Sequence, residues 1–438
     1  MEILMAKDRL TDLPELILLH ILSMLPDSKQ VVRTSALSKQ WRFLWKSVPV
    51  SLDFHFPKYP YESKINKKKI LAFAASTNRE LHYWRSCEKI QAFRVFPYIY
   101  KDYLTEHLDF WVHFATNIAH VEEFTLQFDQ KIYPEFAYLF PQFACTNTSL
   151  RKLVLGSPNL ECLELDKVCG IRRLDISSLK LRKLIITNYE TESDDEHVHW
   201  LEIFAPYIRH LELLGFCCDE IRLQLRNVAS LVTAVLSLNV NFFEVGDEQD
   251  KLDKECRYLQ ELLHSVAHVK NLELGPWCTE FLSVLELKGR LFPQSSWQFL
   301  KLNTALEQLD FPGICSFLQS SLDLETLVID WNDHKPKGLL SRYTNEDEQS
   351  RRFGAHNVNC SLLHLKTIKF INFYGQLSES KFVLPLVKYL LKNATVLKKF
   401  VLSGKFKWSD VPRDYVKMEQ EFLSIPRSSP HASVVFSY

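Results

Sequence analysis

Glycine is scarce in this chain: it supplies only 11 of 438 residues, and no two glycines lie close together. The sequence therefore lacks the Gly-rich turns that bind the phosphates of dinucleotides and nucleoside triphosphates. It also lacks the His-Glu-x-x-His and Gly-x-Ser-x-Gly motifs of metalloproteases and serine hydrolases. These absences predict a protein without catalytic residues and without a cofactor.

A net charge is absent as well, because 53 Lys and Arg residues balance 53 Asp and Glu residues. No global field favours nucleic acid or an anionic membrane, so neither is predicted as a partner. The apolar run Leu16 to Leu19 ends at His20, far short of the about 20 residues of a membrane-spanning helix. Residues 1–10 contain no apolar stretch of signal-peptide length, which favours an intracellular location, in the nucleus or the cytoplasm.

Metal-binding patterns are incomplete. The ten cysteines never form Cys-x-x-Cys, and we expect them to be free and mostly buried. His197 and His199 adjoin the acidic stretch 194–196, but nothing nearby completes a set of four ligands. His264 and His268 have the i, i+4 spacing of a helical chelate and lack a third ligand. No metal site is predicted.

Residues 8–48 form a self-contained segment with three expected helices, separated by Pro26 and by the step Leu37-Ser38. The first helix starts at Pro14, which suits a first turn. Its apolar stripe, with i, i+3, i+4, i+7 spacing, consists of Leu18, Ile21, Leu22 and Leu25. Its other faces are also apolar, because they carry Leu16, Ile17, Leu19 and Met24. A helix that is apolar all round must be covered all round, and a segment of about 40 residues is too small to do so alone.

Two shorter helices are expected next, and Asp27 or Ser28 can cap the first of them. Its apolar edge consists of Val31, Val32 and Ala36. The last helix has apolar residues at i, i+4, i+7 and i+8, namely Leu37, Trp41, Leu44 and Trp45. Two tryptophans on one face of a short helix serve either the segment's own core or a partner, and their spacing leaves both interpretations open.

This segment resembles the F-box of plant F-box proteins. The matching residues are Leu13-Pro14-Glu15, Ile21-Leu22-Ser23, Leu25-Pro26, Val32-Arg33-Thr34-Ser35, Leu37-Ser38-Lys39, Trp41-Arg42, Leu44-Trp45 and Val48-Pro49. Leu16 stands where an acidic residue is common, and Gln40 where a basic one is usual. The resemblance implies that the helices dock on the Skp-type adaptor of a cullin–RING ubiquitin ligase. The residues that it assigns to adaptor binding are Leu13, Pro14, Leu18, Ile21, Leu22, Leu25, Pro26, Val32, Leu37, Trp41, Leu44 and Trp45.

The next part of the chain mixes strand and helix patterns. The alternation over Ser51–Phe56 predicts a strand, and helices are expected over 70–85 and 100–118, each leading into a strand. The basic run Lys67–Lys69 is interpreted as a solvated helix face rather than a nuclear signal or a nucleic-acid patch.

From residue 121 one template recurs: apolar, two residues, apolar, one residue, apolar. Its copies are Val121/Phe124/Leu126, Leu150/Leu153/Leu155, Leu160/Leu163/Leu165, Ile171/Leu174/Ile176, Leu181/Leu184/Ile186, Ile208/Leu211/Leu213, Leu231/Ala234/Leu236, Val269/Leu272/Leu274, Leu324/Leu327/Ile329, Leu365/Ile368/Phe370 and Leu397/Phe400/Leu402. This is the strand unit of a leucine-rich repeat, and its irregular spacing predicts a degenerate repeat solenoid. Steps of about ten residues between 150 and 186 suggest coils with strands on both faces. The polar stretches 190–196, 246–255 and 341–352 are expected to be projecting loops.

The C-terminal residues 356–438 follow a strand–helix–strand pattern with a helix over Leu384–Leu391. They resemble the FBD-like domain that often follows F-box and leucine-rich repeats in plant proteins. The expected fold class is α/β, a three-helix F-box followed by the degenerate repeat solenoid. The expected domains are the F-box at 1–50, a linker with helical entry at 51–120, the repeats at 121–355 and the FBD-like domain at 356–438.

The three resemblances, in the expected order, imply the substrate-receptor subunit of a Skp–cullin–F-box ligase. Its F-box would bind the adaptor, and through it the cullin–RING ligase, while the repeat surface would bind a protein substrate that the sequence does not identify. The alternative is a repeat-based binding scaffold without a ligase, in which the N-terminal helices cap the first repeat. Whether a small molecule completes the substrate site is left open.

Overall fold

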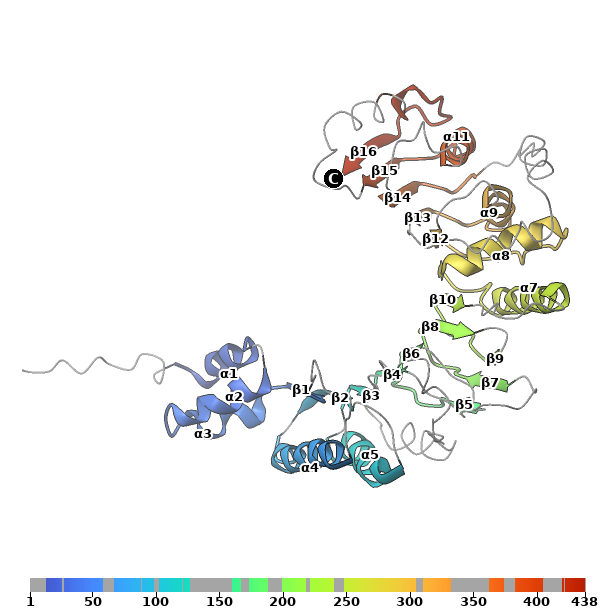
Figure 1. Ribbon diagram of the computed structural model, residues 1–438. Helices are drawn as coiled ribbons and strands as arrows, with labels where there is room; N and C mark the ends of the chain where they lie inside the picture. The colour runs from blue at the N-terminus through green and yellow to red at the C-terminus, as the bar shows by residue number, and fades with distance from the viewer. Residues whose placement is uncertain are drawn as a thin grey trace, which may run out of the picture. The chain divides into compact units, whose positions relative to one another are not determined.

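The computed structural model describes residues 13–25, 27–57, 67–87, 89–97, 102–119, 121–126, 160–166, 173–187, 199–217, 221–239, 248–304, 310–331, 362–373, 383–404, 420 and 422–437. The chain divides into two compact units, Met1–Asp194 and Asp195–Tyr438. Both units combine helices with parallel strands (Figure 1). The chain is therefore a mixed α/β protein, as the sequence predicts.

The N-terminal module, residues 13–48, consists of short helices joined by tight turns. They are α1 (Glu15–Ser23), α2 (Ser28–Arg33) and α3 (Trp41–Leu44), and 3-10 turns follow α2 at Thr34–Ala36 and α3 at Trp45–Ser47. Of the two residues predicted to cap α2, Asp27 is the N-cap: its Oδ1 accepts a hydrogen bond from the backbone N–H of Gln30 at 2.8 Å. That bond, made to the charged form, lowers the pKa of the Asp27 carboxyl. Pro26 lies outside the described residues.

The rest of the first unit alternates strands and helices. Its elements are β1 (Val50–His55), α4 (Lys67–Trp84), β2 (Ile90–Phe96), α5 (Thr105–His113), β3 (Glu123–Leu126), β4 (Cys162–Asp166), β5 (Arg173–Asp175) and β6 (Lys183–Thr187); a 3-10 turn, Asp102–Leu104, precedes α5, and a π-helical turn, Phe114–Ile118, follows it. The expected strand and both expected helices are confirmed. Lys67–Lys69 opens α4 with its first two side chains exposed, which agrees with a solvated helix face.

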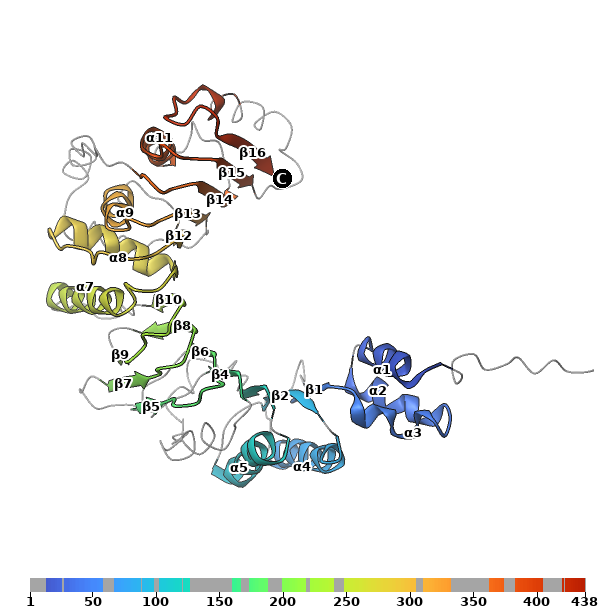
Figure 2. The same ribbon diagram turned by 180° about the vertical axis from the view of Figure 1, so that it is seen from behind.

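The strands of the first unit pair in parallel in the order β1-β2-β3-β4-β6. Helices α4 and α5 lie side by side below β1–β3 in both views (Figures 1 and 2). In the pairing of β4 with β6, Leu163 stands opposite Leu184, and β5, which lies between them in sequence, is not part of this sheet. Each step of about ten residues from β4 to β6 thus holds one strand, and the middle strand lies outside the sheet of the other two.

The second unit contains most of the remaining elements. They are β7 (His199–Phe204), β8 (His210–Cys217), β9 (Ile221–Arg226), β10 (Thr233–Asn239), α7 (Glu248–Ser265), β11 (Asn271–Leu274), α8 (Pro276–Leu287), β12 (Phe299–Thr304), α9 (Asp310–Gln319), β13 (Thr326–Trp331), β14 (Thr367–Phe373), α11 (Val383–Asn393), β15 (Lys399–Gly404) and β16 (Ser433–Ser437). The expected helix near 384–391 is confirmed as α11. Strands β8 and β10 to β16 form one parallel sheet, and β7 pairs with β9.

One loop prediction is wrong. Residues 246–255 were expected to project as a loop, but α7 begins at Glu248. The first turns of α7 are polar apart from Leu252, which begins the helical apolar period. Cys256, Leu259 and Leu263 continue that period and are buried. The expected loops 190–196 and 341–352 lie outside the described residues.

Every template copy that falls on described residues contains a strand, whereas the copy at Leu150 lies outside them. The same hydrogen-bond pattern links successive strands: one backbone carbonyl accepts hydrogen bonds from two neighbouring N–H groups at the start of the next strand. The carbonyl of Gln298 accepts from Glu325 and Thr326 at 2.9 Å each, and that of Lys366 accepts from Lys398 and Lys399 at 2.8 and 3.1 Å. This repeat holds the strands in parallel register.

The core of the second unit lies between the sheet and its helices. Side chains in register across the sheet are fully buried, among them Leu272, Leu300, Leu327, Ile368 and Phe400. Helices α7, α8, α9 and α11 lie on the same side of the sheet in both views (Figures 1 and 2). Side chains of the opposite register therefore face outward as an open strand face. No helix within the described ranges combines the length and apolarity needed to span a bilayer.

Candidate functional site

The N-terminal module has its own small core. The buried residues of this core are Leu18, Leu22, Val31, Trp41, Leu44 and Val48. Four residues predicted to bind an adaptor, namely Leu18, Leu22, Trp41 and Leu44, therefore hold the helices together and offer a partner almost no surface. Of the two interpretations of Trp41, as a core residue or as a contact for a partner, the structure supports the core.

The remaining predicted residues divide between core edge and surface. Leu13, Ile21, Leu25 and Trp45 are partly buried and pack against the module's core. Val32 is half-buried, whereas Pro14 and Leu37 are exposed. Pro26 is outside the described residues. Of the predicted set, Pro14 and Leu37 are thus the most open to a partner.

Large apolar side chains that the core does not use stand on the module's surface. This exposed apolar set consists of Leu16 (79% exposed), Ile17 (47%), Met24 (73%), Leu37 (64%) and Phe43 (60%). Four of the five were not among the predicted binding residues. The guanidinium of Arg42 and the ammonium of Lys46 lie 5.5 and 5.4 Å from the centre of the Phe43 ring. So much uncovered apolar surface on so small a module is typical of a protein interface.

The module is fixed to the α/β part of its own unit. The ring of Trp45 contacts the ring of Trp84 on α4 edge to face, with 5.4 Å between their centres. The Cys87 thiol donates to the carbonyl oxygen of Lys46 at 3.5 Å. A weaker contact joins Lys29 to Glu80 of α4 at 3.8 Å, where the Lys29 side chain is largely exposed and that of Glu80 partly exposed. Trp45 therefore packs the module against α4.

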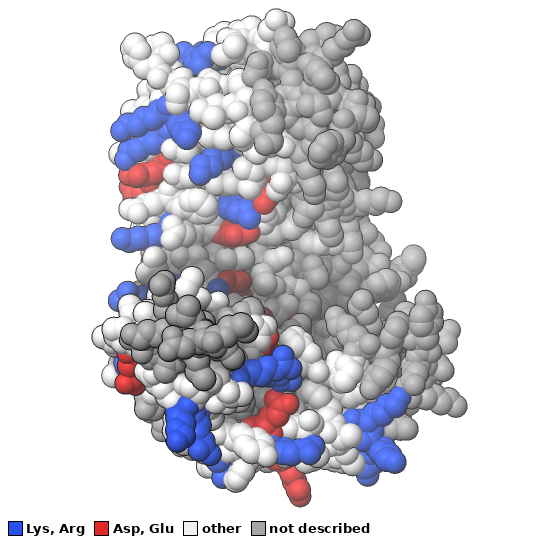
Figure 3. Space-filling view, turned by 90° about the vertical axis from the view of Figure 1, so that its left-hand side faces the viewer, with Lys and Arg blue, Asp and Glu red and all other residues white. Residues whose placement is uncertain are grey.

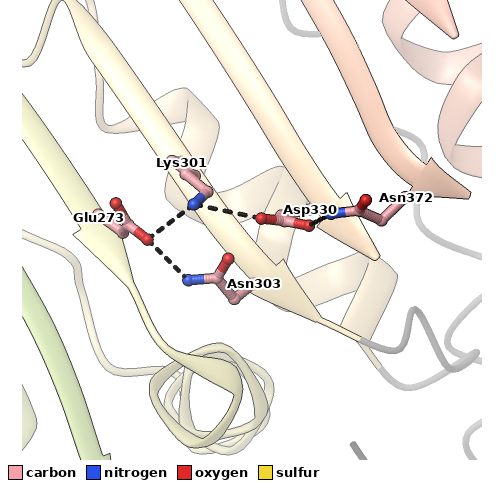
Figure 4. A network of polar contacts seen from close by, with 5 residues as sticks. All are labelled: Glu273, Lys301, Asn303, Asp330 and Asn372. Carbon is pink, nitrogen blue, oxygen red and sulfur yellow. Dashed lines mark hydrogen bonds and ion pairs between the residues drawn. The ribbon is translucent and has the colours of Figure 1, made fainter. Parts of the chain in front are cut away.

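Charged side chains form cross-strand networks on the open strand face of each unit. In the first unit the Arg94 guanidinium binds Glu123 at 2.6 Å and Asp53 at 3.1 Å, and these hydrogen bonds raise the pKa of Arg94. In the second unit the Lys301 ammonium lies 2.9 Å from Glu273 and 3.2 Å from Asp330 (Figure 4). Each positive charge thus lies between two carboxylates.

Two amides complete the network of the second unit. The Asn303 side chain donates to Glu273 at 3.1 Å, and the Asn372 side chain donates to Asp330 at 2.7 Å (Figure 4). Asn372 has a φ of 59°, the left-handed region that asparagine tolerates better than most residues. Each of the five side chains thus has a partner in the network, which links β11, β12, β13 and β14 across the sheet.

The histidine and cysteine patterns do not form a metal site in the described parts of the chain, where no three His, Cys, Asp or Glu residues are arranged to hold an ion. His264 lies in α7 and His268 beyond its end, so the expected common helix is wrong. Their rings bind different carbonyls, of Gln260 at 2.7 Å and of Val228 at 2.9 Å. His197 lies outside the described residues. The cysteines whose state is described are free, as expected: Cys87, Cys162, Cys256, Cys278 and Cys315.

Two protein-family models match this chain, one near each end. Residues 10–52 match the F-box domain, and this range contains the core and the exposed apolar set of the N-terminal module. Residues 356–402 match the FBD domain, and this range contains β14, α11 and most of β15. The chain thus carries an F-box domain near its N-terminus and an FBD domain near its C-terminus.

Proteins similar to this chain occur in Arabidopsis thaliana. One F-box/LRR-repeat protein is 29% identical over 433 residues, covering 91% of this chain and 87% of the relative. Another is 28% identical over 477 residues, covering 99% of this chain and 91% of the relative. An FBD-associated F-box protein is 28% identical over 459 residues, covering 99% of this chain and 98% of its own length. The similarity to plant F-box proteins therefore extends over nearly the whole chain.

Proposed function

We propose that this chain is the non-catalytic substrate receptor of a Skp–cullin–F-box ubiquitin ligase. Its F-box would bind a Skp-type adaptor, and the adaptor would connect it to a cullin–RING ligase inside the cell, in the nucleus or the cytoplasm. The observation that carries the proposal is the exposed apolar set of the F-box, which the module's own core leaves uncovered. Full burial of one such side chain contributes about 1.5–3 kcal/mol, so an adaptor that covers several of them binds stably.

The protein target would bind the open strand face. We propose that the strands belong to degenerate leucine-rich repeats over 121–355, continued by the FBD-like domain over 356–438, after the F-box at 1–50 and a linker at 51–120. Two features support a solenoid: the parallel register of successive strands and the carbonyl that joins each to the next.

A second function is favoured by one contact. Because Trp45 packs edge to face on Trp84, the N-terminal module also covers the end of α4, as a solenoid cap would. A capped scaffold without a ligase remains the alternative proposal. It differs from the first in requiring no adaptor to cover Leu16, Ile17 and Met24.

Substitution on the exposed face of α1 tests the ligase proposal. The full chain, co-expressed with a plant Skp-type adaptor, is expected to form a one-to-one complex by pulldown and size-exclusion mass. Leu16→Asp with Ile17→Asp is expected to weaken adaptor capture by at least about a hundredfold, because two apolar contacts are lost. Leu291→Asp with Leu322→Asp, at exposed leucines of the second unit, is the matched control and is expected to bind normally.

Two outcomes would contradict the ligase proposal. If the wild-type chain is monomeric and ignores the adaptor, the capped scaffold is favoured instead. If the α1 variant captures adaptor as well as wild type, the exposed apolar set is not the contact. Substituting Leu22 would not make this distinction, because Leu22 lies in the module's core and its loss would unfold the module.

A further inference from the structure

Four lysines gather at β14 and β15 in the second unit. Lys366 and Lys398 come just before their strands, and Lys369 and Lys399 lie on the strands themselves. We call these four residues the lysine strip. Strand register places Thr367 opposite Lys399 and Lys369 opposite Val401, so Lys369 and Lys399 are diagonal neighbours. The buried register of the two strands is apolar, with Ile368, Phe370, Phe400 and Leu402. Lys369 and Lys399 therefore face away from the core, on the strand side that Figure 3 views.

Carboxylates offset this charge only in part. Glu325 binds Lys366 at 2.6 Å, and this hydrogen bond, with smaller contributions from His364 and Lys398, lowers the pKa of the Glu325 carboxyl. Lys369 and Lys399 form no ion pair in the described part of the chain. Lys301, three strands from β15 in the same sheet, is held between Glu273 and Asp330. Lys369 and Lys399 thus differ from Lys301 in carrying positive charge without a carboxylate partner among the described residues.

Apolar side chains border the strip. In the register of the open face, Val401 stands beside Lys369, and Val435 of the last strand stands beside Val401. Val401 is half-buried and Val435 is 37% exposed. The surface therefore offers cations next to exposed methyl groups. An extended polypeptide that carries carboxylate and apolar side chains on the same face, at positions i and i+2, is complementary to it, because such residues lie about 6.6 Å apart on that face.

We propose that the lysine strip and Val401 bind an extended acidic segment of the protein target. The inference rests on the proposed function, since it assigns a chemical class to the substrate of the same receptor. Charge complementarity selects the occupant: among the described residues, Lys366 is the one lysine of the strip that has a carboxylate at ion-pair distance, so a segment that carries carboxylates is favoured. The methyl groups favour a peptide over nucleic acid, whose recognition on an exposed surface relies on phosphate contacts.

The test uses the full chain in complex with its adaptor. The probe is a short fluorescein-labelled Glu-Val peptide with the repeat Glu-Ser-Val-Ser, which places Glu and Val on the same face of an extended chain. Binding is followed by fluorescence anisotropy. Lys369→Glu with Lys399→Glu is expected to weaken binding by about tenfold, because two attractive pairs become repulsive. Raising the salt concentration is expected to weaken wild-type binding, since the pairs are exposed to solvent. A peptide with Gln in place of Glu is expected to bind far less well.

The matched control is Lys388→Glu with Lys392→Glu. These two lysines are exposed on α11, on the helical side of the sheet, and the substitution changes the net charge by the same amount. The control is expected to bind the peptide like wild type. Loss of binding to an equal degree in the control would overturn the inference, because it would show a response to overall charge rather than to the strip.

The outcomes separate this inference from the proposed function. Adaptor capture is measured on the same samples. Failure of the wild-type complex to bind the Glu-Val peptide, with adaptor capture intact, overturns the inference alone. Failure of adaptor capture overturns the ligase proposal. A single-stranded RNA is tested as a competitor. If it displaces the peptide and no longer binds the Lys369→Glu, Lys399→Glu variant, the lysine strip binds nucleic acid, and the inference of a peptide ligand is overturned.

Discussion

Gly313→Ala is expected to destabilise the second unit by about 1–3 kcal/mol, the range seen when an atom is forced into a packed interior. Gly313 lies inside α9, where it contacts the backbone of α8. A Cβ at this position would lie 2.5 Å from the backbone nitrogen of Ser283 and 2.7 Å from the carbonyl carbon of Leu282. Main-chain atoms cannot rotate away, so the two helices would have to separate.

The sign of the effect is diagnostic. An alanine in place of a glycine normally stabilises a helix interior, by about 0.5–1 kcal/mol. A loss of stability at Gly313 therefore reports the contact between α8 and α9 and not helix propensity. Urea denaturation of the full chain, with hydrogen–deuterium exchange over 276–319 to assign the transition to this unit, provides the measurement. A more stable Gly313→Ala variant would contradict the close packing of these helices.

Gly289→Ala is the control for this prediction. Gly289 follows α8 with a φ of 64°, and a Cβ there would meet nothing within 4 Å. The substitution is expected to cost about 1 kcal/mol through backbone conformation alone. It should leave the exchange rates of α9 unchanged, whereas Gly313→Ala should raise them in both helices.

Periodicity predicted many of the strands, because strands such as β1, β6 and β15 bury alternate residues. It missed β12, where the first position of the template is Trp297, and Leu300 and Leu302 follow. Trp297 is buried and donates from its indole nitrogen to the carbonyl of Val266 at 3.0 Å. A search for aliphatic residues at the first position passes over such a copy, although the aromatic ring fills the same core space.

β2 was missed as a template copy for a different reason. Ile90, Phe93 and Val95 have the template spacing and are buried. They precede residue 121, in a part of the chain interpreted as a helical entry to the repeats. The pattern was present in the sequence, and β2 pairs with β1 and β3 in the same way as later strands pair with their neighbours.

The proposed binding surface was harder to predict than the fold. The regular stripe of α1 contains Leu18 and Leu22, and the structure places both in the module's own core. The residues left over, Leu16, Ile17 and Met24, face solvent. A helix first packs its regular stripe against its own domain, so the surplus apolar residues outside the stripe are the better indicator of a partner. That signal was in the sequence, as apolarity on every face of the helix.

Trp41→Ala is expected to unfold the N-terminal module, because truncation of a buried tryptophan costs about 3–5 kcal/mol. Among the described residues, the buried core around Trp41 consists of Leu18, Leu22, Val31, Leu44 and Val48. A core of this size supports a stability of only a few kcal/mol, so the loss exceeds what the module can absorb. Hydrogen–deuterium exchange over residues 15–47 is expected to lose its protection, and adaptor capture is expected to fail with it.

Phe43→Ala separates folding from binding, since Phe43 lies two residues further along α3 and is exposed. This variant is expected to change the stability of the module by no more than about 0.5 kcal/mol, as surface substitutions usually do. It should nevertheless weaken adaptor capture, because the ring belongs to the exposed apolar set. Normal exchange protection and normal capture in Trp41→Ala would refute the core assignment. Normal adaptor capture by Phe43→Ala would show that the Phe43 ring does not contact the adaptor. The contribution of Leu16 and Ile17 is tested separately, by the Leu16→Asp, Ile17→Asp variant.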